Sequence, residues 1–187
     1  VLYNLAMYGY GLLIRLASYR NEKARKFLEG RNGLFRELRT NIVTNEHYIW
    51  FHCASLGEFE QGRPLIEQIR SRLPHARLVV TFFSPSGYEM CKDYDYVDEI
   101  YYLPIDTLAN ARKFVTLLRP KVAIFMKYDF WYNHLRVLRE EDIPTLLVSG
   151  RFRRDQLFFR GYAGLARQLL QYFDHFFVQD QNSQSLL

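Results

Sequence analysis

Two kinds of hydrophobic pattern alternate along the chain from residue 47 onward. Short runs rich in β-branched and aromatic residues indicate strands covered on both faces, because such strands are apolar almost throughout. Between these runs, apolar residues recur at helical spacing, as Leu65, Ile66 and Ile69 do, which indicates amphipathic helices. The pattern predicts strands at 47–53, 77–83, 99–103, 121–127, 145–150 and 175–180, and helices at 58–72, 107–118, 130–141 and 156–173.

This alternation of strand and helix predicts an α/β fold, a doubly wound sheet of mostly parallel strands. Ligands of such sheets bind beyond the carboxyl ends of the strands, so the residues that directly follow each strand are the candidates for a site. Residues 181–187 resemble the first turn of a helix after the sixth strand. We therefore expect residues 46–187 to form one domain, with a second domain absent from this chain.

The first 45 residues have a composition of their own. Residues 1–19 are mostly apolar and aromatic, but Asn4 and Arg15 interrupt them, whereas a membrane span needs roughly 20 apolar residues. Aromatic residues followed by basic ones suit a helix that lies on an anionic membrane surface. An amphipathic helix packed on its own domain or on a partner domain explains the same pattern equally well. A longer natural N-terminus could complete an anchor, and we expect a peripheral or N-terminally anchored protein.

The net charge of +5 comes entirely from this N-terminal segment. Residues 1–45 contain eight basic and three acidic side chains, and the totals of 25 and 20 leave 17 of each sign for the rest of the chain. A neutral body argues against a nucleic-acid partner. The two cysteines, Cys53 and Cys91, have neither metal-ligand nor redox spacing, which favours a reducing compartment. The five histidines show no ligand spacing either, so we expect them to be structural and the protein to need no metal.

The turn after the first strand carries the strongest candidate for chemistry. Ala54 to Glu58 is a run of small residues that leads into a helix, and Gly57 permits a tight turn and close approach of a ligand. The carboxylate of Glu58 could take the proton of a hydroxyl group that attacks a sugar. The alternative is an acid that complements the helix dipole. A helix N-terminus lowers the basicity of a carboxylate and burial raises it, and the sequence does not determine which effect is larger for Glu58.

Other strand ends also carry polar side chains. Ser86 and Gly87 follow the second strand and could bind a phosphate or a sugar, or form an ordinary capped turn. After the fourth strand, Lys127 could pair with phosphate and Trp131 could stack on a sugar or acyl chain, with Asp129 as a ligand-binding group or as a helix cap. Arg151 follows the fifth strand and suits a phosphorylated substrate, although a solvated helix face explains this basic residue nearly as well.

Several of these strings together resemble one known family. His52 to Glu58 resembles the signature of the transferases of 3-deoxy-D-manno-octulosonic acid (Kdo), and Leu103 to Asp106 resembles their Leu-Pro-x-Asp segment. The segment Met126 to Asn133 resembles their Met-Glu-Thr-Glu-Leu-Trp-Pro-Asn motif. It departs from that motif at Lys127, a basic residue in place of the first Glu, and at Asp129, which replaces the second Glu. The likeness also includes Thr81 to Gly87 and Arg151, and it extends over about residues 46–187.

The resemblance implies the N-terminal half of a GT-B glycosyltransferase, with two Rossmann-like domains around a cleft. It implies inverting transfer of Kdo from CMP-Kdo, held mainly by the C-terminal domain, to a lipid A precursor, without a metal or other cofactor, at the cytoplasmic face of the inner membrane. Alone, this half would bind acceptor without transferring sugar. The implied base is Glu58, and the implied acceptor-binding residues are Ser55, Gly57, Ser86, Gly87, Lys127, Asp129, Trp131 and Arg151. The alternatives are a non-catalytic lipid- or sugar-phosphate-binding module and a GT-B transferase that uses another nucleotide sugar.

Overall fold

The computed structural model describes residues 2–44, 46–156 and 164–187. Its centre is a six-stranded sheet in which every pairing between neighbouring strands is parallel. The strands are β1 (Tyr48–Cys53), β2 (Arg77–Phe82), β3 (Glu99–Tyr102), β4 (Pro120–Met126), β5 (Thr145–Gly150) and β6 (His175–Val178). The six predicted strands and the predicted α/β fold are thereby confirmed.

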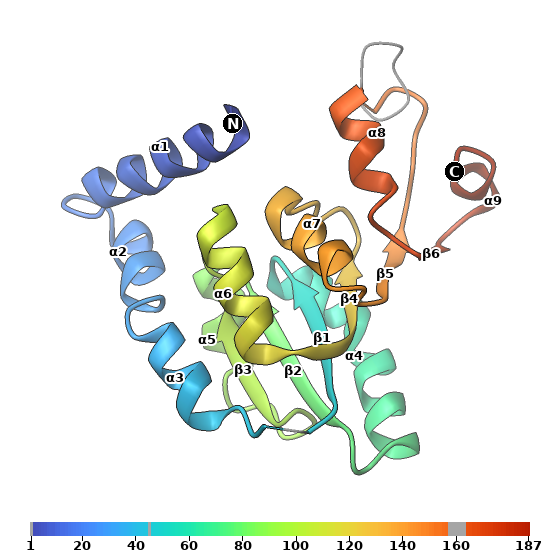
Figure 1. The fold of residues 1–187 in the computed structure, drawn as a ribbon, viewed down its shortest axis with the longest axis horizontal. Coiled ribbons are helices and arrows are strands. Elements are labelled where there is room, and N and C mark those ends of the chain that lie inside the picture. Colours follow the sequence, from blue (N-terminus) through green and yellow to red (C-terminus); the bar gives the residue numbers. More distant parts are fainter. Residues whose placement is uncertain (1, 45, 157–163) are drawn as a thin grey trace.

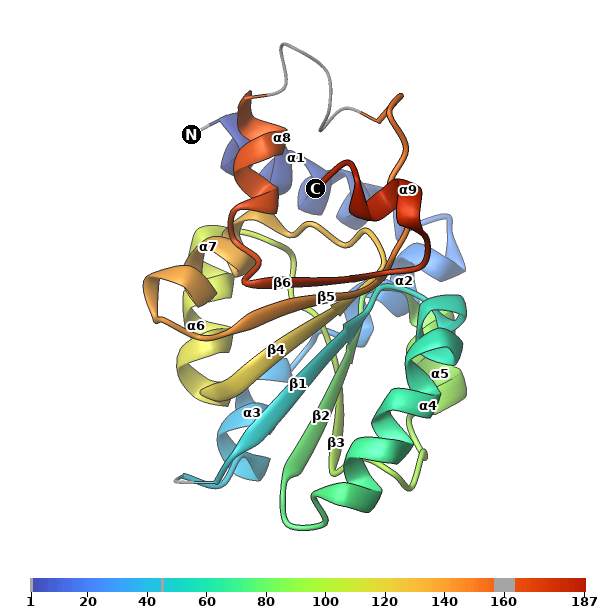
Figure 2. The ribbon, with the colours of Figure 1, turned by 90° about the vertical axis from the view of Figure 1, so that its right-hand side faces the viewer.

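A helix follows each strand, and several of these helices cover the two faces of this sheet (Figures 1 and 2). The helices after the strands are α4 (Leu56–Arg72), α5 (Pro85–Cys91), α6 (Leu108–Leu118), α7 (Tyr132–Glu140), α8 (Gly164–Leu170) and α9 (Gln181–Gln184). Figure 2 shows α4 and α5 on one face and α6 and α7 on the other. Of the helix predicted at 156–173, residues 157–163 lie outside the described residues.

The strand order reverses beside β1, and we call the space at the carboxyl ends of β1 and β4 the crevice. Neighbouring strands follow the order β3-β2-β1-β4-β5-β6, so the chain moves outward from β1 in one direction and then returns to its other side at β4. At such a reversal the connections after the two strands leave toward opposite faces of the sheet, and the space between them is where doubly wound proteins bind ligands. The turns after β1 and β4 therefore border the predicted ligand edge.

Alternating side chains of the strands fill two apolar cores. Trp50 lies in one core with Phe114 and Leu138, and the adjacent Phe51 lies in the other with Phe59. All five side chains are fully buried. Successive residues of a strand point to opposite faces, so a run without polar interruption is what a sheet covered on both sides requires.

Three helices precede the sheet, namely α1 (Leu2–Ala17), α2 (Glu22–Glu29) and α3 (Leu34–Asn41). Leu34 and Leu38 of α3 belong to the same buried core as strand residues of β1 and β4. Within the described residues, no helix combines the length and the apolar character needed to cross a membrane. Residues 22–41 thus pack as part of the domain, while α1 extends past the carboxyl edge of the sheet (Figure 1).

Arg31 connects these helices to the strand ends. Its guanidinium donates to the carbonyl oxygens of Phe27, Phe83 and Leu103 at 2.9, 2.8 and 2.9 Å. It also lies 3.5 Å from the centroid of the Phe27 ring and 4.9 Å from that of Tyr102. Burial lowers the pKa of Arg31 to about 9, because it removes the hydration that stabilises the charged guanidinium. Carbonyl dipoles and ring faces compensate the cation.

A buried carboxylate connects α1 to the body. Asp106, fully buried, accepts a hydrogen bond from the Tyr3 hydroxyl of α1 at 2.6 Å. The same carboxylate accepts the backbone amides of Asn133 and His134, each at 3.0 Å, and pairs with the His134 ring. It therefore holds the N-terminus of α7 as well. Asn4 adds a further contact by accepting the backbone amide of Leu108 at 3.1 Å.

Candidate functional site

The turn after β1 presents Glu58 at the first turn of α4. Ser55 is the N-cap of α4, and the two residues form a capping box in which the Ser55 amide donates to Glu58 Oε2 at 3.1 Å. Gly57 between them is exposed, and the space that a Cβ would occupy there is open. The residues predicted after β1 therefore lie at the crevice, with a helix N-terminus that a ligand can approach.

The environment of Glu58 makes it a stronger base than an exposed carboxylate. Partial burial raises its pKa, and the nearby charge of Asp129 raises it further. Hydrogen bonds from the backbone of Ala54 and Ser55 oppose this rise without cancelling it. Burial, with the charge of Asp129, therefore outweighs the backbone hydrogen bonds of this turn in setting the direction of the pKa shift.

The loop after β4 brings Asp129 and Trp131 to the other side of the crevice. The Asp129 side chain is 16% exposed, and its Oδ2 lies 3.1 Å from His52 Nε2. The Trp131 ring packs on Phe83, with 4.3 Å between ring centroids. Lys127 begins the loop with a φ of 61°, a left-handed backbone conformation that costs about 1 kcal/mol or more in a residue with a side chain.

One reading of this loop is wrong. Asp129 is not the cap of α7, because Trp131 occupies the N-cap position and makes no side-chain capping bond. The carboxylate that accepts amides of the first turn of α7 is Asp106, which comes from the loop after β3. Asp129 is thereby free of the capping role and lies near Glu58 instead.

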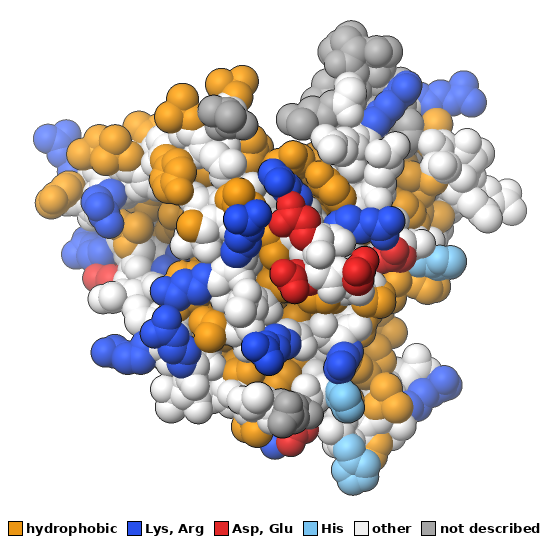
Figure 3. Space-filling model, in the orientation of Figure 1, with side chains coloured by type: hydrophobic (Ala, Val, Ile, Leu, Met, Phe, Trp, Pro, Cys, Tyr) orange, Lys and Arg blue, Asp and Glu red, His pale blue; other side chains and the backbone are white. Residues whose placement is uncertain are grey.

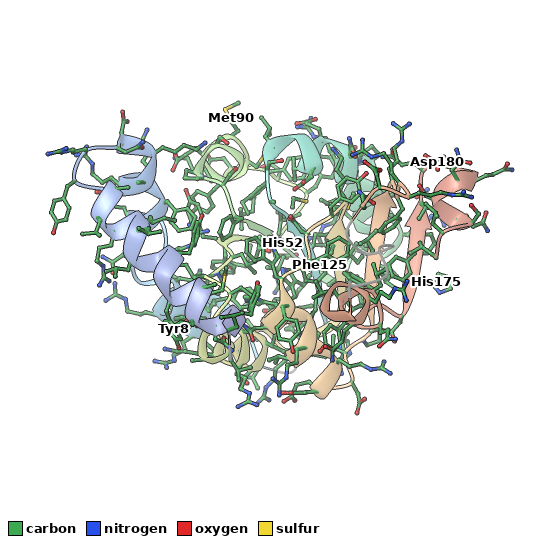
Figure 4. The ribbon with its side chains drawn as sticks, turned by 90° about the horizontal axis from the view of Figure 1, so that it is seen from above. Tyr8, His52, Met90, Phe125, His175 and Asp180 are labelled. Carbon is green, nitrogen blue, oxygen red and sulfur yellow. The ribbon has the colours of Figure 1, made fainter. Side chains whose placement is uncertain are left out.

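His52 connects the two sides of the crevice, a role that its place in the motif alone does not predict. Its ring is fully buried near the middle of the sheet, beside Phe125 (Figure 4). Nδ1 lies 2.8 Å from Thr81 Oγ1, and Nε2 accepts the indole N–H of Trp131 at 2.8 Å. A histidine near the end of a central strand, just before the turn that carries a candidate base, is the signal that could have identified it.

The turn after β2 contributes less than expected. Ser84 caps α5, and its hydroxyl accepts the Gly87 amide at 3.3 Å, so that amide is already paired. Gly87 is buried, and a Cβ there would lie 2.5 Å from the Phe82 ring and 3.1 Å from the Leu56 amide. Ser86 is exposed, with its hydroxyl 3.2 Å from that of Ser84. The capped turn is thus present, and Ser86 keeps the more accessible polar group.

Arg151 lies farther along the edge, after β5. Its side chain is 66% exposed and its Nε lies 3.3 Å from Asp180 Oδ2, which follows β6. Neighbouring Ser149 has a φ of 61° at an irregularity in the β5–β6 pairing, and its hydroxyl donates to Gln61 Oε1 at 3.1 Å and accepts from Gln179 at 2.7 Å. Glu58, Asp129 and Trp131 therefore gather at the crevice, while the Arg151 side chain belongs to a polar group at the β5 and β6 ends, which contacts α4 through Gln61.

Comparison with known proteins agrees with this architecture. A family model described as 3-deoxy-D-manno-octulosonic-acid transferase (kdotransferase) matches residues 21–187. The chain is 32% identical over 105 residues to a 3-deoxy-D-manno-octulosonic acid transferase of Haemophilus influenzae, which covers 55% of this chain and 24% of that protein. It is 30% identical over 127 residues to the enzyme of that name from Chlamydia muridarum, covering 67% of this chain and 29% of that protein.

Two further similarities are broader in coverage and lower in identity. A bifunctional glycosyltransferase/methyltransferase of Fusobacterium nucleatum is 26% identical over 182 residues, which covers 92% of this chain and 28% of that protein. A crystal structure from Listeria monocytogenes, described as a UDP-N-acetylglucosamine 2-epimerase, superimposes with a TM-score of 0.54 at 12% identity, covering 76% of this chain and 42% of that one. The latter likeness concerns the fold alone. The chain spans about a quarter to a third of the length of these curated relatives.

Proposed function

The chain belongs to the 3-deoxy-D-manno-octulosonic-acid transferase family, and on that premise we propose that it is the acceptor-binding half of an enzyme that transfers Kdo from CMP-Kdo to a lipid A precursor. The donor is held mainly by a second, C-terminal domain of the full protein, so this half binds acceptor and does not transfer sugar alone. The observation that carries the proposal is Glu58, a carboxylate of raised pKa at the switch point of the sheet.

In the proposed reaction Glu58 acts as the general base. It takes the proton of an acceptor hydroxyl while that oxygen forms a bond to the anomeric carbon of Kdo, and the bond from that carbon to the CMP phosphate breaks. Attack on the face opposite the leaving CMP inverts the configuration. A raised pKa serves this role, because a base whose pKa approaches the working pH accepts the proton more readily.

The acceptor lies along the crevice in this proposal. Ser55 and Gly57 border Glu58 at the open helix N-terminus, and Ser86 faces solvent at the neighbouring turn. Gly87 allows the two turns to approach each other, because a side chain there would collide with Phe82 and Leu56. On the other side, Asp129 and the Trp131 ring contact the sugar, while Lys127 and Arg151 receive the phosphates of the lipid.

The outer face of α1 holds the protein at the membrane surface. Tyr3 and Asn4 turn inward to Asp106 and Leu108, and the opposite face presents an apolar stripe to solvent, visible over α1 in Figure 3. Its residues are Leu2, Leu5, Tyr8, Leu12, Leu13 and Leu16, exposed by 58% to 81%. Basic side chains lie near the end of the stripe and after it, at Arg15, Arg20 and Lys23, which suits an anionic cytoplasmic leaflet.

Transfer of Kdo by the complete parent protein, before and after Glu58→Gln, tests the base. Gln at the third helical position preserves the capping box, so the helix start is retained while the base is lost. We expect kcat to fall by about 10²-fold or more. Glu60→Gln on the same helix, an exposed carboxylate paired with Arg63, is the matched control and should leave kcat unchanged. Full activity of the Glu58 variant would rule out this base, and an inactive unmodified parent would rule out the reaction.

Vesicle sedimentation tests the membrane surface. We expect the chain to bind anionic vesicles in a salt-sensitive manner. The triple substitution of Leu5, Leu12 and Leu16 by Gln should weaken binding about tenfold or more, because it removes these apolar side chains from the interface. Substitution of Leu73 and Met90 by Gln removes comparably exposed apolar side chains elsewhere and serves as the control. Equal binding by both variants would refute the role of α1.

A further inference from the structure

His52 makes two hydrogen bonds that fix the state of its ring. The indole N–H of Trp131 can only donate, so His52 Nε2, 2.8 Å away, must accept and therefore carries a lone pair. A neutral imidazole then carries its proton on Nδ1, which donates to Thr81 Oγ1 at 2.8 Å. Thr81 also accepts the indole N–H of Trp50 at 2.8 Å and donates to the Phe51 carbonyl. The two tryptophans of the chain are thus both connected to this histidine, one through each ring nitrogen.

Asp129 lies at the same nitrogen without a hydrogen bond. Its Oδ2 is buried, lies 3.1 Å from His52 Nε2 and has no hydrogen-bond partner among the described residues. A nitrogen that accepts from Trp131 cannot at the same time donate to Asp129. A buried acceptor left unpaired costs about 1–3 kcal/mol, so the two side chains of this loop compete for one atom.

We propose that His52 is the positioning residue of the crevice. Its neutral ring, protonated on Nδ1, holds the Trp131 indole at the ligand edge through the lone pair of Nε2. Asp129 is the side chain that competes for that nitrogen. Trp131 packs on Phe83 with its ring, so the hydrogen bond to His52 supplies the directional contact that fixes the indole. Only the kinetic consequence of this inference rests on the proposed function.

Nuclear magnetic resonance of the unmodified 187-residue chain provides the first test. A long-range ¹H–¹⁵N spectrum should show His52 with a protonated Nδ1 and an unprotonated Nε2 at neutral pH. The indole N–H of Trp131, identified by its loss in Trp131→Phe, should show a nuclear Overhauser contact to the His52 ring. A protonated Nε2, or no contact between the rings, would overturn the proposal without any change to the core.

Two substitutions separate the ring nitrogens. The amide of Gln reaches the place of Nε2, so His52→Gln keeps an acceptor for Trp131 but loses the donor to Thr81. The amide of Asn reaches the place of Nδ1, so His52→Asn keeps the donor to Thr81 but loses the acceptor for Trp131. We expect the Trp131 indole proton to exchange about fivefold faster in His52→Asn, because one hydrogen bond is lost. In His52→Gln its exchange rate should stay that of the unmodified chain.

The Trp50 indole is the internal control of this experiment. It should keep its resonance in His52→Asn and shift in His52→Gln, the reverse of Trp131. If both indoles shift together in both variants, His52 serves only to pack the core and the proposal fails. Asp129→Ala removes the competitor and should slow exchange of the Trp131 proton, whereas faster exchange would contradict the competition.

Kinetics of the complete parent protein test the consequence for the acceptor. With His52→Asn we expect KM for the acceptor to rise about fivefold or more while kcat changes less, in contrast to the loss of kcat expected for Glu58→Gln. An unchanged KM alongside a released Trp131 would refute the positioning role. An inactive unmodified parent would count against the proposed function alone, because the spectra of the isolated chain would still decide the role of His52.

Discussion

Substitution of Asp106 by Asn tests the buried carboxylate that connects α1 and α7. Asp106 is fully buried and accepts from the Tyr3 hydroxyl, from two backbone amides of α7 and from the His134 ring. An Asn side chain of the same size has one oxygen only, so its amide must face donors that the second carboxylate oxygen satisfied. Removing one partner of a buried, hydrogen-bonded pair costs about 3 kcal/mol or more. With a urea dependence of about 2 kcal/mol per molar, the unfolding midpoint should fall by about 1.5 M.

The same carboxylate should make stability depend on acid. Burial by itself would raise the pKa of Asp106, but the neighbouring His134 and the hydrogen bonds from Tyr3 and Asn133 outweigh it and lower the pKa below its usual range. A lowered pKa in the folded state contributes stability above the unfolded pKa of about 3.9, and this contribution is lost as pH falls through the folded pKa. Asp106→Asn should therefore flatten the fall of stability below about pH 4.

Urea unfolding of parent and variant, followed by circular dichroism at pH 7 and pH 3.5, measures both effects. Glu140→Gln is the matched control, because that carboxylate pairs with Arg136 and Arg112 at the surface, where such pairs contribute at most about 1 kcal/mol. The reasoning would be refuted if Asp106→Asn shifted the unfolding midpoint by less than about 0.3 M, or by no more than the control does. The buried carboxylate could not then contribute about 3 kcal/mol to stability.

Three further changes should alter stability in defined directions. Gly87→Ala should cost about 1–3 kcal/mol in thermal unfolding, because its Cβ would lie 2.5 Å from the buried Phe82 ring, whereas Gly57→Ala, with open space, should be nearly neutral. Arg31→Met should cost about 2 kcal/mol or more, since three carbonyl oxygens lose their donors, and limited proteolysis should then cleave near α2 sooner. Glu58→Gln should stabilise the chain at pH 7, because the raised pKa of Glu58 means that folding disfavours its charge, and the difference should shrink as pH falls through that pKa. A less stable Gln variant at pH 7 would contradict the raised pKa.

The sequence determined the elements and the first part of the site because both depend on short-range patterns. Six apolar runs predict the six strands, and the spacing between them predicts the helices that make parallel pairing possible. The run from Ala54 to Glu58 likewise predicts a turn followed by a helix with Glu58 in its first turn, and a capping box forms there. For helix α5 the sequence predicts only a capped turn, because its seven residues give too little periodicity to distinguish a helix.

The tertiary structure alone decided which distant side chains meet. Asp106 accepts the amides of α7 from a loop 27 and 28 residues earlier, a relation that local capping rules assign to Asp129. Trp131 reaches His52 across 79 residues because the strand order places β4 beside β1, and no pattern along the chain encodes that order. The direction of the pKa shift of Glu58 depends on the same neighbours, since its burial and the charge of Asp129 exist only in the folded chain. Local propensity thus specifies the turns, and the packing of strands from different parts of the chain specifies the chemistry of the crevice.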